Sequence, residues 1–306
     1  MLCTAGRETT PVARRSRFHG VCWCGLLRGL LMGDAGPVAW IAHYASDCWD
    51  NEMTETANPS TGAMRVMTVG IVAGMGPAAG VDFARLFVHA SEQWLREHGQ
   101  PVRDQAFPEH WIAQVPVVDR TQALRDPGAP QPLEGLVSAL ERLAAVGARA
   151  AAMSCNTAHA WHAALQERVP GVELLHIARE TAAELQRRGI RRAALLATQG
   201  TYGMGLYDEA FDTHGVECVL PSAEAKERLM EGIYDGVKAG DMALARRRFA
   251  EVGQAVRAQH GDVPLVMACT EIPLALPDAP EAAGWTLVDP SGILAAALVR
   301  RAYGDH

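Results

Sequence analysis

A pattern that occurs twice along the chain is the feature that most constrains the fold. In each copy an apolar run, 66–73 or 192–197, leads into a glycine-rich stretch, "GMGP" or "TQGTYGMG". A later apolar run, 148–153 or 263–268, leads into a cysteine. The segments between these runs have apolar residues near helical spacing, and alternating strands and helices are typical of parallel sheets with right-handed crossovers. We therefore predict an α/β protein with two pseudo-symmetric domains, each a parallel-sheet α/β sandwich.

The same periods predict the individual elements and the domain boundaries. Strands are expected at 66–73, 110–118, 148–153, 192–197 and 263–268. Helices are expected at 78–97, 132–147, 157–169, 178–189, 204–214, 223–239, 241–260, 270–277 and 290–303. The first domain is predicted to comprise 65–170 plus 288–306, and the second 171–287. Ligands of parallel sheets bind at the carboxyl ends of the strands, so we expect the active site in the cleft between the domains.

The composition excludes several classes of protein. The chain of 306 residues has a formal charge of −7, whereas a nucleic-acid partner favours a basic surface. No stretch is apolar for the roughly 18 residues that a membrane span requires. The seven cysteines lack the regular spacing of a disulfide framework. We expect a cytoplasmic homodimer whose partner is a small molecule, with no nucleic-acid partner and no membrane partner.

Residues 1–64 differ from the rest of the chain. They hold four of the seven cysteines and show no sustained helical or strand period. We predict that this segment is an N-terminal extension, either disordered or a misassigned start. A targeting peptide is the alternative, because Arg14, Arg15 and Arg17 precede an apolar stretch, but Arg28 interrupts that stretch and no clear cleavage site follows.

Cys155 and Cys269 are expected at equivalent strand ends, each where a helix begins. A thiol has a pKa of about 8.5, and a helix N-terminus lowers it, so we expect both thiols to ionise more readily than usual. If the two domains pack around a pseudo-two-fold axis, the two sulfurs face each other. Two facing acid/base groups can invert a stereocentre, because one removes a proton and the other delivers one to the opposite face.

Other interpretations of these cysteines stay open. A free cysteine is often a small buried apolar residue, and a disulfide between them is disfavoured in a reducing compartment. Cys155, His159 and His162 are spaced along one helical face and could bind a metal. A structural zinc site needs four ligands, so we predict no metal.

From about residue 66 to its C-terminus, the chain resembles the cofactor-independent aspartate/glutamate racemase family. The resemblance is carried by seven stretches: "GIVAGMGP", "FPEHWIAQVPVVDRT", "GARAAAMSCNTAH", "LLATQGTYGMGLYDEAF", "LMEGIYDGVKAG", "MACTEIPLAL" and "LVDPSGILA". The resemblance implies that Cys155 and Cys269 are the catalytic acid/base pair, that Arg120 and Lys238 bind substrate carboxylate, and that no cofactor is needed. It also implies five further substrate-binding residues: Met75, Gly76, Asn156, Thr157 and Thr270.

Alternatives remain for the two cations and for the reaction. Arg120 could form a surface salt bridge with Asp119, and Lys238 could lie at a solvated helix end. An enzyme that uses pyridoxal phosphate would need Lys226 or Lys238 as its Schiff-base lysine, and neither follows a strand. We predict a racemase of aspartate or glutamate. The alternatives are a hydantoin racemase, a maleate isomerase or a decarboxylase of the same superfamily, and a non-catalytic amino-acid-binding protein.

Overall fold

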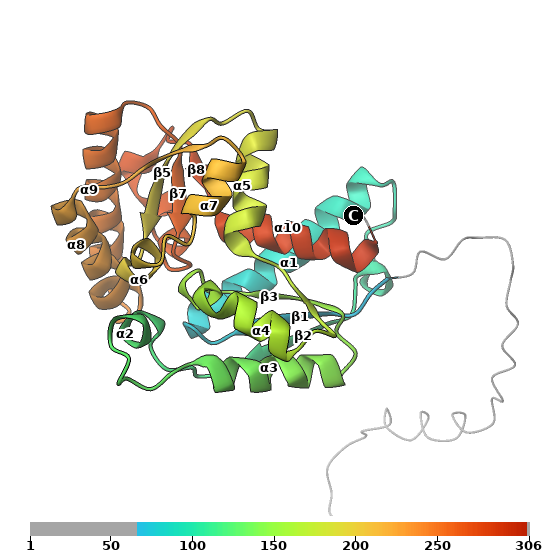
Figure 1. Cartoon of the computed structure of the whole chain (residues 1–306). Coiled ribbons are helices and arrows are strands. Elements are labelled where there is room, and N and C mark those ends of the chain that lie inside the picture. The colour runs from blue at the N-terminus through green and yellow to red at the C-terminus, as the bar shows by residue number, and fades with distance from the viewer. Residues whose placement is uncertain (1–65, 305–306) are drawn as a thin grey trace, which may run out of the picture. The chain divides into compact units, whose positions relative to one another are not determined.

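The computed structural model describes residues 66–304, which contain two four-stranded parallel sheets (Figure 1). The strand orders are β2-β1-β3-β4 and β6-β5-β7-β8. The strands are β1 (Val69–Ala73), β2 (His110–Gln114), β3 (Ala150–Met153), β4 (Glu173–Leu174), β5 (Arg192–Ala197), β6 (Glu217–Val219), β7 (Leu265–Ala268) and β8 (Leu287–Val288). Each sheet has its first and third strands at the centre. This repeated topology confirms the predicted pseudo-symmetric α/β fold.

Helices connect the strands and cover the sheets. The α-helices are α1 (Pro77–Glu97), α2 (Arg120–Arg125), α3 (Leu133–Ala145), α4 (His162–Arg168), α5 (Ile177–Arg187), α6 (Gln199–Gly203), α7 (Asp208–Thr213), α8 (Ala223–Glu231), α9 (Met242–His260) and α10 (Pro290–Tyr303). The short helices are η1 (Asp104–Ala106), η2 (Thr157–Trp161), η4 (Ile272–Leu274), η5 (Leu276–Asp278) and η6 (Pro280–Ala282), all of the 3-10 type, and the π-helix η3 (Gly232–Val237).

Both faces of each sheet are covered by helices. The first sheet packs against α1 and α10 on one face and against α3 and α4 on the other (Figure 1). The second sheet packs against α8 and α9 on one face and against α5 and α7 on the other. Successive strand residues point to opposite faces, so the central strands β1, β3 and β7 consist of small or apolar residues that are all buried, as is usual for buried parallel strands. A fully buried side chain such as Phe83 or Phe249 contributes about 1.5–3 kcal/mol to folding.

The central strands and the long helices lie where the sequence predicts them, but several shorter elements differ. The helix expected at 157–169 is a 3-10 turn, η2, followed by α4, and the helix expected at 223–239 ends as the π-helix η3. Of the helix expected at 204–214 only Asp208–Thr213 is helical, as α7, because Gly205 has a positive φ of 57° and separates it from α6. The helix expected at 270–277 is wrong: 3-10 turns replace it, because Pro273 and Pro277 lack the N–H that an α-helix needs.

Two further points concern the predicted organisation. Strand β4 follows residue 170 in sequence yet pairs with β3 of the first sheet, and the division of the chain at residues 170 and 171 stays a prediction. The predicted extension at 1–64 lies outside the described residues. Among residues 66–304, no helix is both long enough and apolar enough to cross a membrane.

Candidate active site

The ends of the central strands deliver the predicted site residues. Cys155 follows β3 by two residues, and Cys269 directly follows β7. Met75 follows β1, and Thr198 follows β5. Since all these strands are parallel, each side chain lies at the carboxyl edge of its sheet, where parallel α/β proteins bind ligands.

Two glycines after β1 allow a tight approach of the chain to its neighbours. Gly74 has a φ of +96°, and a Cβ atom there would lie 2.2 Å from the carbonyl oxygen of Val115. A Cβ atom on Gly76 would lie 3.3 Å from Oε1 of Glu271. Gly74 is therefore required at the turn itself. Gly76 leaves room for the carboxylate of Glu271, which comes from the second sheet.

Eight of the nine predicted site residues line one pocket, which encloses about 310 Å³ when its opening to solvent is included. The ninth, Gly76, lies beside it. The full lining is Met75, Asp119, Arg120, Thr121, Cys155, Asn156, Thr157, Thr198, Tyr234, Lys238, Cys269, Thr270 and Glu271. The pocket therefore contains two thiols, two cations and two carboxylates, contributed by elements attached to both sheets.

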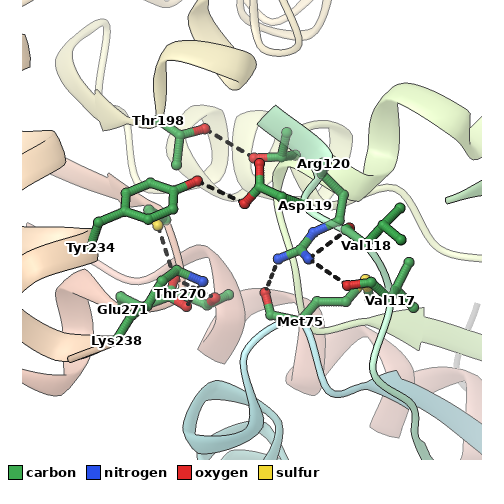
Figure 2. A network of polar contacts seen from close by, with 12 residues as sticks. Met75, Val117, Val118, Asp119, Arg120, Thr198, Tyr234, Lys238, Thr270 and Glu271 are labelled. Carbon is green, nitrogen blue, oxygen red and sulfur yellow. Dashed lines mark hydrogen bonds and ion pairs between the residues drawn. The ribbon is translucent and has the colours of Figure 1, made fainter. Parts of the chain in front are cut away.

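Arg120, at the start of α2, hydrogen-bonds to three backbone carbonyls on the first-sheet side of the pocket. Its Nη1 donates to the carbonyl oxygens of Val117 (3.1 Å) and Val118 (3.0 Å), and its Nη2 donates to that of Met75 (2.5 Å; Figure 2). The side chain is buried, so it does not form the surface salt bridge considered from the sequence. Burial alone would lower the pKa of Arg120, but the neighbouring Cys155, Asp119 and Glu271 raise it, so the guanidinium stays charged.

The contacts of Arg120 leave part of the guanidinium available. A guanidinium has five N–H groups, and three of them bond to the backbone carbonyls. One N–H on Nη2 remains, together with that on Nε, which is buried and has no hydrogen-bond partner among the described residues. Two N–H groups are enough for a two-pronged contact with one carboxylate.

Cys269 lies in a different environment, next to an acid. Its Sγ donates to Oε2 of Glu271 at 3.0 Å, and Oε1 of Glu271 pairs with Nζ of Lys238 at 2.9 Å. The Lys238 side chain is 27% exposed and that of Glu271 only 5%. Lys238 is thus not at a freely solvated helix end. Burial lowers the pKa of Lys238, but the carboxylate of Glu271 outweighs burial and raises it.

The expectation that a helix N-terminus lowers the thiol pKa is wrong for Cys269. Burial raises the pKa of this thiol well above its usual value, and the negative charge of Glu271 raises it further. Lys238 opposes these effects only partly. No α-helix begins at either cysteine: η2 follows Cys155 and η4 follows Cys269, and both are short 3-10 turns. Short turns lack the aligned peptide dipoles on which that expectation depended.

Polar residues that follow each cysteine form a hydrogen-bonded lining. The hydroxyl groups of Thr157 and Thr198 lie 3.0 Å apart, which links the ends of β3 and β5. Oδ1 of Asn156 accepts a 2.5 Å hydrogen bond from the hydroxyl of Tyr207, and Nδ2 of Asn156 is buried without a partner among the described residues. Thr270 donates to Glu271 at 3.2 Å.

Tyr234 and Asp119 join the two sides of the pocket. Tyr234, in the π-helix η3, donates its hydroxyl proton to Oδ2 of Asp119 at 3.0 Å (Figure 2). Oδ1 of Asp119 caps α2 by accepting from the backbone N–H of Gln122. π-Helical turns are rare and often occur at functional sites. This one places both Tyr234 and Lys238 on the pocket.

Sequence reasoning missed several residues of this lining. Glu271 is the most consequential, and its signal was the carboxylate two positions after Cys269 in "CTE". Asp119 directly precedes Arg120 in "DRT", and Tyr234 comes four residues before Lys238. Each was visible beside a predicted residue, but nothing in the sequence says which way its side chain points. Thr121 and Thr198 were missed for the same reason.

The histidines near Cys155 do not form a metal site. Nδ1 of His159 bonds to the carbonyl oxygen of Cys155 at 2.8 Å, and Nε2 of His162 bonds to that of Leu174 at 2.6 Å. Within residues 66–304, no three His, Cys, Asp or Glu side chains are grouped so that they could hold a metal ion. Burial lowers the pKa of His159 to about 4, so the ring is neutral at pH 7 and supports the Cys155 loop as a hydrogen-bond donor.

The fold and the pocket define a class of enzyme. Two thiols, a guanidinium and an ammonium group at the carboxyl ends of two parallel sheets are groups suited to proton transfer on an anionic substrate. The sequence profile of the Asp/Glu/hydantoin racemase family matches residues 72–298. Because this match spans well over half of the chain, the protein belongs to that family, and it is a racemase, an isomerase.

Individual relatives agree with this assignment. The chain is 24% identical over 207 residues to the broad specificity amino-acid racemase RacX of Bacillus subtilis (strain 168), covering 67% of this chain and 85% of RacX. The Picrophilus torridus aspartate racemase matches with a TM-score of 0.65 and 25% identity, covering 77% of this chain and 94% of that one. An aspartate racemase homologue from Pyrococcus horikoshii OT3 shares the fold, with a TM-score of 0.60 at 23% identity, covering 78% and 99%.

Proposed function

We propose that this protein racemises an acidic amino acid, aspartate or glutamate, without a cofactor, by proton transfer between the substrate Cα and two cysteines, Cys155 and Cys269. The observation that carries the proposal is that both thiols, from equivalent strand ends of two sheets, line the same pocket. A single thiol could remove and return a proton only on one face of the substrate. Two thiols from opposite sides serve both faces, as inversion requires.

The charges of the lining suit a dicarboxylate that also carries an ammonium group. Arg120 retains two free N–H groups for one carboxylate, and Lys238 can exchange its contact with Glu271 for the other. Asp119 and Glu271 can accept from the substrate ammonium group. The pocket thus offers two cations and two anions to a substrate with two negative charges and one positive charge.

The reaction then proceeds in two proton transfers. One cysteine, as a thiolate, takes the Cα proton, and the electron pair left on Cα delocalises into the α-carboxylate. The cation bound to that carboxylate stabilises the additional negative charge, because it is fixed in place before the charge develops. The second cysteine, as a thiol, gives its proton to the opposite face. The reverse reaction exchanges the two roles.

The test is to incubate the purified protein with single L-amino acids, with no added cofactor, and to follow the D-enantiomer by chiral chromatography. Aspartate and glutamate should give the D-enantiomer. Because the relative from Bacillus subtilis is named for broad specificity, neutral and basic amino acids belong in the same panel. Faster turnover of a neutral amino acid would overturn the acidic substrate class. Turnover that appears only with pyridoxal phosphate would overturn the two-thiol mechanism.

A further inference from the structure

Cys269 is buried next to an acid that the two-thiol mechanism does not use. The Cys269 residue is 5% exposed, and its sulfur donates to the Glu271 carboxylate at 3.0 Å. Glu271 is itself buried and bonds through its other oxygen to Lys238 at 2.9 Å. Lys238 is the most exposed of the three groups. The contacts therefore form an unbroken chain from a buried thiol to a group that reaches solvent.

We propose that Glu271 is a third proton-transfer residue, which exchanges a proton with Cys269 and, through Lys238, with the solvent. The inference rests on the proposed function and adds a step to it. A two-thiol racemase ends each turnover with the proton on the wrong sulfur for another turnover in the same direction. The enzyme must then move protons between its thiols and the solvent while the pocket holds no substrate.

The step balances without any further reactant. After Cys269 has given its proton to Cα, it is a thiolate beside Glu271. Lys238 transfers one N–H proton to Glu271, and Glu271 passes a proton to Sγ. One N–H bond breaks, one S–H bond forms, and Glu271 returns to the carboxylate. Water at the pocket opening reprotonates Lys238, and Cys155 releases the proton that it took from the substrate.

The surroundings of Cys269 also determine where its proton lies in the resting enzyme. The groups that act on Cys269 are Glu271, which disfavours a second negative charge beside it, and Lys238, which opposes this only partly. The sulfur donates its proton to a hydrogen bond with Glu271. The substrate-free enzyme therefore holds a proton on Cys269, in contact with the carboxylate that restores this proton after a turnover.

The first measurement uses the substrate-free protein. Iodoacetamide reacts with thiolates, and peptide mass spectrometry resolves each cysteine, so the alkylation rate of each can be followed against pH. In the wild type at pH 7, Cys269 should react slowly, because burial and Glu271 raise the pKa of its thiol. In Glu271→Gln the Cys269 profile should move to lower pH, because the charge that raises the pKa of this thiol is gone. An unchanged Cys269 profile in Glu271→Gln would overturn the proposal.

The second measurement is turnover. Glu271→Gln should lower kcat by about 10²-fold or more, the lower end of what a positioned proton-transfer group contributes, although its Cys269 ionises more readily. Because Glu271 is also placed to accept from the substrate ammonium group, KM is measured beside kcat, and a loss confined to KM would assign Glu271 to binding alone. Glu271→Asp, which keeps a carboxylate, should recover part of kcat. The matched control is Glu184→Gln on α5, whose carboxylate pairs with Arg187 and Arg188, and it should leave both readouts unchanged.

Two outcomes contradict the role of Glu271. Unchanged kcat in Glu271→Gln would exclude it as a proton-transfer group, and a loss of kcat without the shift in the Cys269 profile would assign it a structural role. If Glu271→Gln does not fold, the wild-type alkylation profile and Glu271→Asp still decide. A wild type that racemises no amino acid would overturn the proposed function instead, and the alkylation rates would remain a separate test of the Cys269–Glu271 contact.

Discussion

The ends of β3 and β7 occupy equivalent places in two sheets of the same topology, yet their surroundings differ in charge and in support. Four residues after Cys155 comes His159, whose ring bonds to the Cys155 carbonyl, whereas four residues after Cys269 comes Pro273. Arg120 acts on the first sulfur and Glu271 contacts the second. Backbone symmetry thus places two thiols on one pocket, and the side chains around them give each thiol different charged neighbours.

The largest effect should come from removing either thiol. Cys155→Ser and Cys269→Ser should each lower kcat/KM by about 10³-fold or more, because a hydroxyl is far too weak an acid to replace a thiolate. In deuterated water each variant should exchange the Cα proton of one enantiomer without inverting it. NMR should show opposite preferences for the two variants. If both variants racemise at near wild-type rates, the two cysteines are not catalytic and only pack in the core.

Arg120 should affect activity and stability together, because it binds backbone carbonyls on the first-sheet side. Arg120→Ala should lower kcat/KM by about 10²-fold or more and the free energy of unfolding by about 2–4 kcal/mol, since one buried and two part-buried carbonyls lose their donors. Arg120→Lys keeps the positive charge but loses the forked pair of N–H donors. Its kcat/KM and its free energy of unfolding should therefore lie between those of the wild type and Arg120→Ala. Chiral assays and urea unfolding provide the two measurements. Unchanged kcat/KM in Arg120→Ala would remove Arg120 from the site.

His159 should make the Cys155 side the more acid-sensitive one. Its pKa is about 4 in the folded protein and about 6.5 unfolded, so below pH 6.5 the unfolded chain binds a proton that the folded protein does not. Its contribution to stability is thus complete above about pH 6.5 and is lost as the pH falls to about 4, by about 3 kcal/mol. His176, whose burial lowers its pKa to about 3, adds to the same slope.

The check is urea unfolding at several pH values. His159→Asn keeps an N–H donor for the Cys155 carbonyl but cannot titrate, so its stability should fall less steeply between pH 6.5 and 4. His98→Asn, at the C-cap of α1, serves as a control. Equal slopes in His159→Asn and the wild type would show that His159 is not protonated on unfolding.

The smallest effect should come from the hydroxyl group of Tyr234, which joins the two sides through Asp119. Tyr234→Phe removes this one hydrogen bond, worth about 1 kcal/mol, and should change KM by about three- to tenfold with little change in kcat. The matched control is Tyr303→Phe, whose hydroxyl bonds to the Ala106 carbonyl away from the pocket. A large loss of kcat in Tyr234→Phe would give Tyr234 a part in the chemistry itself.

Much of the architecture was predictable because it depends on local patterns. The runs that became β1, β3, β5 and β7 give strands of four to six mostly apolar residues, so their type and order could be predicted directly. The edge strands β4, β6 and β8 have only two or three residues and carry too short a pattern to recognise. The turns after the cysteines were predicted as α-helices because η2 has helix-like composition and the prolines after Cys269 were given too little weight.

The sequence by itself determined that two cysteines end equivalent strands and that a cationic residue stands in each half of the repeat. Chain order and strand periodicity are enough for that, because parallel strands must end at a common edge. Only the tertiary structure decided the chemistry around each sulfur. Glu271 is two residues from Cys269 in sequence, but its two oxygens reach Sγ and Lys238 only after the π-helix has brought Lys238 to the pocket. Burial and charge act through space, so the raised pKa of the Cys269 thiol follows from packing.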